Sequence, residues 1–177
     1  DLKGGSSVKR GGWLLAPRIH APVARFDAKL KVLSSENRPL RHWTPVHVHA
    51  GSGESPGRVA TLSEKEIAPG NEGFVQIVLD RRVGILRSDH FVLRDQSASR
   101  TIAGGFVIDP FSPARGRGKP RRIEYLRDME NTKPTAALTS LLQNNQAGID
   151  LKLFSIAWNL TEEELEKHLA TVGHVLA

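Results

Sequence analysis

A short stretch rich in arginine and hydroxyl side chains, "RDQSASRTIAGG" (residues 94–105), carries the groups best suited to hydrogen-bond an anion. Paired glycines within a strand mark a bulge or a point where another backbone comes close. Arginine and hydroxyl groups beside such bare backbone also suit the phosphates and riboses of nucleic acid. The residue types alone favour the structural role of the glycines and leave binding open. The candidate binding residues are Arg94, Arg100, Thr101, Gly104 and Gly105.

Two other patterns resemble a metal site and a phosphate-binding loop, but each lacks residues that such a site requires. His47 and His49 alternate along "VHVHA", so both imidazoles would lie on one side of a strand and could share a metal ion. A zinc site needs a third ligand, and neither an H-x-E motif nor a cysteine accompanies them. "GRGK" lacks the spacing of a phosphate loop, because Pro113 and Pro120 stand where glycine and Ser or Thr are required. We therefore predict no catalytic residue, no metal ligand and no cofactor for this chain.

The charge is unevenly distributed along the chain. Residues 1–122 carry 21 Lys and Arg against 11 Asp and Glu, whereas residues 123–177 carry 4 against 8. A basic first part favours a polyanionic partner. The run "SPARGRGKPRR" (residues 112–122) is either a solvated linker or a phosphate-binding segment whose contacts would weaken with salt. Its cations are Arg115, Arg117, Lys119, Arg121 and Arg122.

The first 110 residues have the pattern of short strands. In "ARFDAKLKV" apolar and polar residues alternate with the period of two that a strand with one buried face requires. Turn-rich spacers such as "GSGESPG" and "APGNEG" separate the further segments. About six such strands predict a closed antiparallel barrel, because closure removes the strand edges that otherwise aggregate. The expected strands cover residues 24–32, 46–50, 58–63, 74–80, 90–95 and 101–108.

After the basic run the apolar period becomes helical. We expect helices in "AALTSLLQ", "LKLFSIAWNL" and "LTEEELEKHLATVG", followed by a strand-like "HVLA", which together suggest a truncated winged helix. The acidic third helix does not suit nucleic-acid recognition. Trp13, Trp43 and Trp158 are predicted to anchor the core or a domain interface rather than to stack on bases.

These patterns divide the chain into four parts. Residues 1–17 would end a preceding β-barrel domain, residues 18–111 form the barrel, residues 112–122 are a connector that neither strand nor helix would tolerate, and residues 123–177 are the winged-helix part. The chain begins without methionine in a glycine-rich turn, so we expect it to be a piece of a longer protein.

Three segments, taken in order, resemble a known family. "HVHAGSGESPGRV", "FVLRDQSASRTIAGG" and "PARGRGKPRR" are similar to the third domain and the following connector of selenocysteine-specific elongation factors, which are GTPases related to elongation factor Tu. The resemblance implies a full-length protein that uses GTP and Mg²⁺ and carries selenocysteinyl-tRNA to a ribosome paused at a recoded UGA codon. Its GTPase domain, and the last winged helices that hold an mRNA hairpin, would lie outside this chain.

For this chain the resemblance implies a non-catalytic barrel that flanks the acceptor and T stems of selenocysteine tRNA. It places the five hairpin residues on or near that surface, with His49 and Arg58 as neighbours. Ala50 stands where the family has a further histidine, which weakens any role for His49. The implied partners are selenocysteine tRNA, the ribosome and the protein's own GTPase domain, in the cytoplasm and without a membrane. The alternatives are a protein-docking barrel of another GTPase related to elongation factor Tu and, remotely, a metal enzyme built on His47 and His49.

Overall fold

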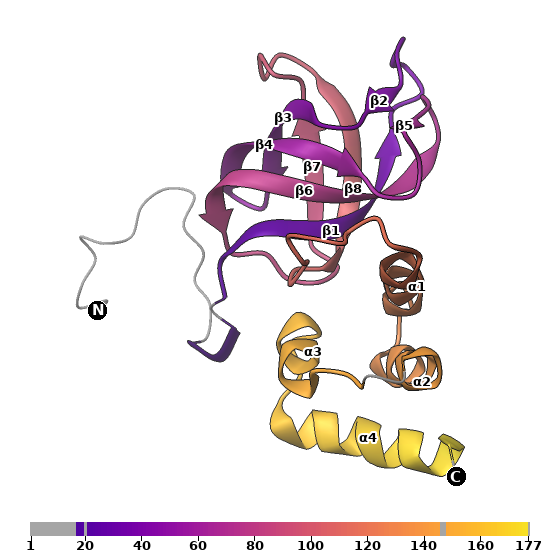
Figure 1. Ribbon diagram of the computed structural model, residues 1–177. Helices are drawn as coiled ribbons and strands as arrows, with labels where there is room; N and C mark the ends of the chain where they lie inside the picture. The colour runs from indigo at the N-terminus through magenta and orange to yellow at the C-terminus, as the bar shows by residue number, and fades with distance from the viewer. Residues whose placement is uncertain (1–16, 20, 146–147, 177) are drawn as a thin grey trace, which may run out of the picture.

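The computed structural model describes residues 17–19, 21–145 and 148–176 (Figure 1). A short 3-10 helix, η2 (Pro17–Ile19), precedes the first strand. The end of a preceding domain that we expected in residues 1–17, including Trp13, lies outside the described residues except for Pro17.

Within the described residues, six antiparallel strands close into a barrel in the order β1-β6-β4-β3-β7-β8, which confirms the predicted fold class (Figure 1). A separate two-stranded sheet pairs β2 with β5. The strands are β1 (Val23–Val32), β2 (Leu40–Arg41), β3 (Thr44–Ala50), β4 (Gly53–Thr61), β5 (Glu66–Ile67), β6 (Glu72–Val83), β7 (His90–Arg94) and β8 (Thr101–Asp109).

The barrel interior follows the alternation seen in the sequence. On β1 the side chains of Phe26, Ala28, Leu30 and Val32 are all buried and join the core of the barrel. Asp27 lies between two of them and points to the opposite face, yet it is fully buried too. The outer face of β1 must therefore be covered by another part of the chain.

That cover is provided by helices. In the described part of the chain, four helices follow the barrel: α1 (Pro120–Met129), α2 (Pro134–Asn144), α3 (Leu151–Ala157) and α4 (Glu162–Leu176). Leu62, Phe74 and Ile108 on the outside of the barrel share one hydrophobic cluster with Leu126 and Leu138 of the helices. The barrel and the helices are therefore packed against each other.

Two details that we predicted for the part after the barrel were wrong, one in the connector and one at the end of the last helix. Residues 120–122 are not connector but the first turn of α1, because proline is well tolerated at the first position of a helix, where its missing N–H would have no partner. The segment expected to be a strand, residues 174–177, continues α4 as far as Leu176. A capping box precedes α4: Glu164 N donates to Thr161 Oγ1 (3.2 Å), and Thr161 N donates to Glu164 Oε2 (2.7 Å). The winged-helix assignment and the other domain boundaries stay predictions.

The two glycines of β8 have different surroundings, which gives a matched test of the barrel. A Cβ added to Gly105 would lie 2.1 Å from the carbonyl oxygen of Lys29 on β1, whereas one added to Gly104 would lie 3.5 Å from the carbonyl oxygen of Phe91. Gly105→Ala must therefore push β8 away from β1. We expect it to lower the free energy of unfolding by about 1–3 kcal/mol or more, the usual cost of overpacking.

Urea unfolding of both alanine variants measures this difference. Gly104→Ala is the control and should change the free energy of unfolding by only about 0.5 kcal/mol, as for most surface substitutions. An equal loss in the two variants would contradict the close approach of β8 to β1.

Candidate nucleic-acid interface

One outer wall of the barrel brings together residues from four neighbouring strands. On β3 the side chains of Val46, Val48 and Ala50 are buried, so the alternate residues Pro45, His47 and His49 point outward. Their partners in the neighbouring strands lie on the same side. We call this surface the four-strand face; it consists of Pro45, His47, His49, Glu54, Pro56, Arg58, Val92, Arg94, Thr101 and Gly104.

Cross-strand pairing arranges these residues in rows. His47 pairs with Arg94, which pairs in turn with Thr101. In the next row, His49 pairs with Val92, which pairs with Gly104. Arg58 of β4 pairs with Pro45 of β3. Five of the residues predicted from sequence therefore share one surface: His49, Arg58, Arg94, Thr101 and Gly104. Gly105 does not, because it pairs with the buried residues Phe91 and Leu30.

The turn between β7 and β8 is organised by Asp95. Its carboxylate accepts hydrogen bonds from Ser99 Oγ (2.8 Å), Ser99 N (2.7 Å) and Arg100 N (3.3 Å). The bond from the Ser99 hydroxyl is the largest of the influences that lower the pKa of Asp95 to about 2. Arg94 Nη2 donates to the carbonyl oxygen of Ser99 (3.1 Å), which ties the end of β7 to the turn. Asp95 is therefore ionised near neutral pH and can accept these hydrogen bonds.

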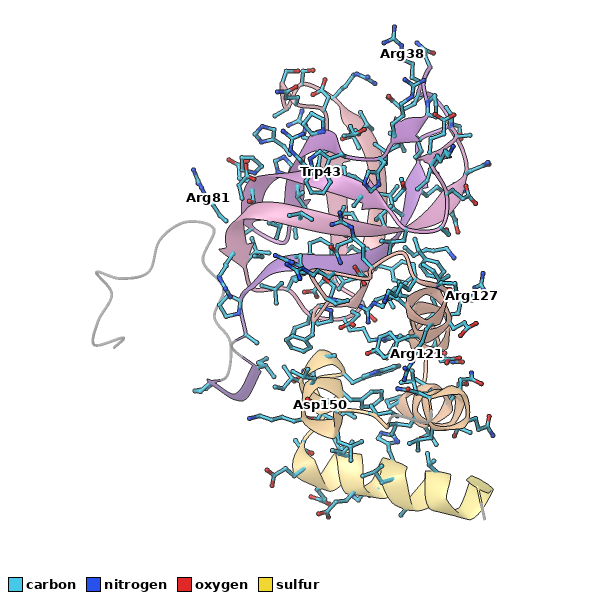
Figure 2. The ribbon with its side chains drawn as sticks, viewed as in Figure 1. Arg38, Trp43, Arg81, Arg121, Arg127 and Asp150 are labelled. Carbon is cyan, nitrogen blue, oxygen red and sulfur yellow. The ribbon has the colours of Figure 1, made fainter. Side chains whose placement is uncertain are left out.

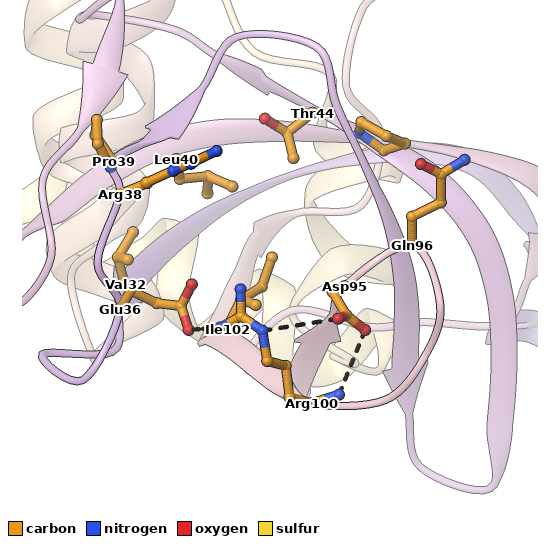
Figure 3. A pocket seen from close by; sticks show the side chains of 11 residues that line it. Val32, Glu36, Arg38, Pro39, Leu40, Thr44, Asp95, Gln96, Arg100 and Ile102 are labelled. Atoms are coloured by element: carbon orange, nitrogen blue, oxygen red, sulfur yellow. Dashed lines mark hydrogen bonds and ion pairs between the residues drawn. The ribbon is translucent and has the colours of Figure 1, made fainter.

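Arg100, although exposed, is partly neutralised by acidic neighbours. Its guanidinium is paired with Glu36, and its Nε lies 3.7 Å from Asp95 Oδ2. Figure 3 shows these groups in a pocket of about 270 Å³ at the end of the barrel, with Val32, Leu40 and Ile102 among its lining residues. An incoming phosphate would have to compete with two carboxylates for Arg100, so its contribution to anion binding is smaller than its exposure suggests.

The two histidines of the four-strand face do not form a metal centre with other residues. His49 Nδ1 lies 3.8 Å from Glu54 Oε2. Among the described residues, no group of three or more His, Cys, Asp or Glu side chains is placed to hold a metal ion. The pair of histidines alone does not supply the ligands that a zinc site needs.

The cations of the connector are divided between two environments. Arg117 lies over the ring of Trp43, with 5.3 Å from the guanidinium carbon to the ring centroid, and Arg58 of the four-strand face lies 6.0 Å from the same centroid. Arg115 and Lys119 are exposed. Arg117 therefore extends the positive charge of the four-strand face around Trp43. Trp43 is 42% exposed, so the predicted core position is wrong, whereas a place at a domain interface stays a prediction.

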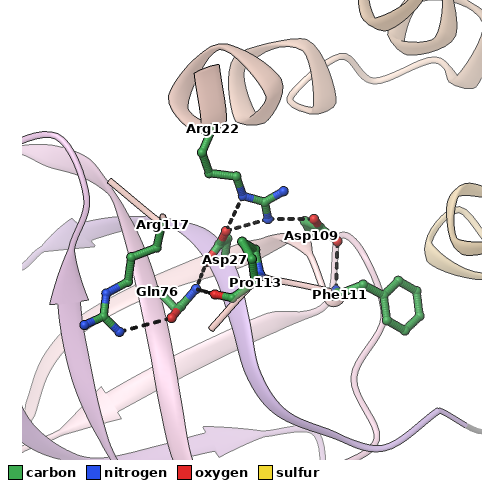
Figure 4. A network of polar contacts seen from close by, with 7 residues as sticks. All are labelled: Asp27, Gln76, Asp109, Phe111, Pro113, Arg117 and Arg122. Carbon is green, nitrogen blue, oxygen red and sulfur yellow. Dashed lines mark hydrogen bonds and ion pairs between the residues drawn. The ribbon is translucent and has the colours of Figure 1, made fainter. Parts of the chain in front are cut away.

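Arg122 lies in the interface between the barrel and the helices instead. Its Nε donates to Asp27 Oδ2 (2.8 Å) and its Nη2 donates to Asp109 Oδ2 (2.6 Å), as Figure 4 shows. Both carboxylates are buried, and 13% of the Arg122 side chain is exposed. Burial raises the pKa of Asp27, and the charge of Arg122 opposes that rise. Arg121 donates to Asn145 of the helical part. Arg122 thus joins the barrel to the helical part, whereas Arg121 remains exposed.

A second arginine, which our sequence analysis did not single out, joins the same two parts. Arg87 Nη2 donates to the carbonyl oxygen of Met129 (2.8 Å), and the Arg87 guanidinium carbon lies 3.5 Å from the ring centroid of Trp158. Burial lowers the pKa of Arg87 to about 10. Lys29 Nζ and Glu130 Oε1 form a further ion pair across the interface (3.1 Å). Trp158 is thus an interface residue, as predicted, while no motif around Arg87 indicated its role.

Comparison with known proteins assigns the barrel to a domain family. Residues 27–114 match the family model described as "Selenocysteine-specific elongation factor, beta-barrel domain", from β1 to the start of the connector. The chain belongs to the selenocysteine-specific elongation factor family. The match is to the barrel domain of the family, so it assigns no catalytic activity to this chain.

Relatives in the same family extend the similarity to nearly the whole chain. The selenocysteine-specific elongation factor of Escherichia coli (strain K12) is 28% identical over 170 residues, 96% of this chain. The protein of the same name from Desulfomicrobium baculatum is 29% identical over 175 residues, 95% of this chain. The chain spans about a quarter of the length of these relatives, 26% in each case. In the described part of this family member, no helix has the length and apolar character to cross a membrane.

The network around Arg122 gives a prediction for the stability of this family member. Arg122→Leu leaves two buried carboxylates without their cation, and breaking a buried pair in this way costs about 3–5 kcal/mol. Arg121→Leu, which removes an exposed cation from the adjacent position, is the control and should cost only about 0.5 kcal/mol. Equal losses in urea unfolding at neutral pH would contradict the network.

The cost of Arg122→Leu should also depend on pH. The substitution removes the charge that opposes the raised pKa of Asp27, so the pKa in the folded variant rises further above its unfolded value. A raised pKa in the folded state stabilises the protein below the unfolded pKa, and this contribution is lost as the pH rises through the folded pKa. We therefore expect the largest loss relative to the unsubstituted protein near neutral pH and a smaller loss towards the ordinary pKa of aspartate.

Proposed function

We propose that the four-strand face, together with the exposed cations of the connector, binds the tRNA carried by a selenocysteine-specific elongation factor. Neighbouring cross-strand rows on one outer wall contain His49, Arg58, Arg94 and Thr101. This arrangement is the main support for the proposal. These residues come from four strands and lie on one surface, with Pro45, Pro56 and Val92 between them. A surface of this kind suits a duplex that is recognised along its backbone.

The chemistry of A-form RNA fits this arrangement. Its deep major groove hides the base edges, while phosphates and ribose hydroxyls are accessible. Arg58 and Arg117 can pair with phosphates, and the exposed hydroxyl of Thr101 can hydrogen-bond a ribose 2′-hydroxyl. Gly104 has no side chain on this face, which lets the RNA backbone come close.

The contacts of each cation indicate how available it is to bind RNA. Arg58, Arg94, Arg117, Arg115 and Lys119 are the strongest candidates because none is held by a carboxylate in the ion pairs across the described residues. Arg100 contributes less, since Glu36 and Asp95 compete for it. Arg122 is excluded from the RNA surface by its position between Asp27 and Asp109.

In the whole protein this part would bind tRNA without catalysing a reaction. The relatives are named selenocysteine-specific elongation factors, and on that basis we propose that the whole protein delivers selenocysteinyl-tRNA to the ribosome at recoded UGA codons. GTP and Mg²⁺ would be bound by a GTPase domain outside this chain. The helical part would connect the barrel to the domains that hold the mRNA hairpin, and the protein would act in the cytoplasm.

Substitution of one exposed arginine tests the proposal. Arg58→Gln should weaken binding of selenocysteine tRNA and should reduce the slope of log affinity against log salt by about 1, as expected when one phosphate contact is lost. Fluorescence anisotropy with labelled tRNA over a series of KCl concentrations gives both quantities.

Arg127→Gln is the matched control, because Arg127 is exposed on α1 (Figure 2) and the substitution removes the same charge away from the four-strand face. Its affinity should change little. If Arg127→Gln reduced the slope as much as Arg58→Gln, binding would depend on net charge rather than on this face, and the proposal would be wrong.

A further inference from the structure

Trp43 has an unusual backbone conformation that holds its side chain at the surface. It lies between β2 and β3 with a φ angle of 69°, in the left-handed region that bulky residues rarely adopt. Such strain costs about 1–3 kcal/mol and persists only where neighbouring contacts enforce it. Here Trp43 N donates to the carbonyl oxygen of Val59 (2.6 Å), and Arg58 Nη1 donates to the carbonyl oxygen of Trp43 (3.3 Å). The exposed fraction of Trp43 is 42%.

The cations near the ring lie farther from it than a closely stacked guanidinium does. Arg58 and Arg117 lie 6.0 Å and 5.3 Å from the ring centroid, and the ring of His42 is 6.0 Å away and inclined by 27°. At Trp158, by contrast, the guanidinium carbon of Arg87 lies only 3.5 Å from the ring centroid. Trp158 and Arg87 form a closed stack, whereas the cations near Trp43 do not cover its ring closely.

We propose that Trp43, Arg58 and Arg117 form a stacking site for one unpaired base of an RNA. The inference rests on the proposed RNA-binding function and adds to it a specific type of nucleotide. Unpaired bases stack on aromatic rings and on guanidinium planes, whereas bases within a duplex are already stacked on each other. The two arginines also supply positive charge for the phosphates that flank such a base.

The site adjoins the four-strand face, because Arg58 belongs to both. An RNA that offers a duplex with an unpaired nucleotide beside it would therefore engage both surfaces at once. The four-strand face contacts the backbone of the duplex, and Trp43 selects for the unpaired base.

Two RNA probes separate these contributions. A fluorescent oligoadenylate, which is single-stranded, and a blunt-ended RNA duplex are each titrated with the whole chain. Trp43→Leu keeps an apolar side chain and removes the aromatic ring. It should weaken binding of the oligoadenylate on the order of tenfold, since stacking on one aromatic residue contributes about 1–3 kcal/mol per base. Binding of the duplex should change little.

Two further variants serve as controls. Trp43→Phe retains a ring and should keep most of the affinity for the oligoadenylate. Leu153→Ala shortens another exposed apolar side chain, on α3, and should change neither titration. Folding of each variant is checked by its urea unfolding midpoint.

The other outcomes would overturn the inference. Equal weakening of both probes by Trp43→Leu would mean that Trp43 only positions Arg58 and Arg117. Unchanged binding of the oligoadenylate, with the duplex still bound, would reject the stacking site and leave the proposed function standing. If the unsubstituted chain bound neither probe, the proposed function would fail, and the inference with it.

Discussion

A buried network of Asp27, Gln76, Asp109 and Arg122 joins the barrel to the first helix after it. Asp27 and Asp109 lie on paired strands of the barrel, and both carboxylates are buried under the helical part. Their burial is tolerable only with a cation and further hydrogen-bond donors in place, because an unpaired buried charge is very costly. Arg122 comes from the first turn of α1, so the pairing fixes where that helix begins on the barrel.

The same network fixes the path of the connector. Phe111 N donates to Asp109 Oδ1 (2.8 Å), Gln76 Nε2 donates to the carbonyl oxygen of Pro113 (3.0 Å), and Arg117 Nη1 donates to Gln76 Oε1 (3.3 Å). The connector is therefore attached to the barrel at several points before it enters α1. Arg117 reaches Trp43 as a result, and one run of cations in the sequence acquires two roles, with Arg117 at the surface and Arg122 in the interface.

The sequence was sufficient for the barrel, because its strands depend on local patterns, while the binding role of the candidate residues stays a prediction. Alternation along each strand predicted which residues point outward, and the order of the motifs indicated the family. Pairing between distant residues could not be predicted in this way. Asp27 was expected on the solvent side of β1, and its burial depends on Arg122, which is 95 residues away. No local motif indicates the left-handed backbone conformation of Trp43 or the exposure of its side chain.

Binding of the unsubstituted chain to selenocysteine tRNA and to an elongator tRNA, over a series of salt concentrations, tests the central claim most directly. If this chain has a tRNA-binding surface, selenocysteine tRNA should bind more tightly, and the slope of log affinity against log salt concentration should correspond to several phosphate contacts. Equally weak binding of the two tRNAs, or no binding, would contradict it. The barrel and helices would then serve to hold the neighbouring domains of the protein together.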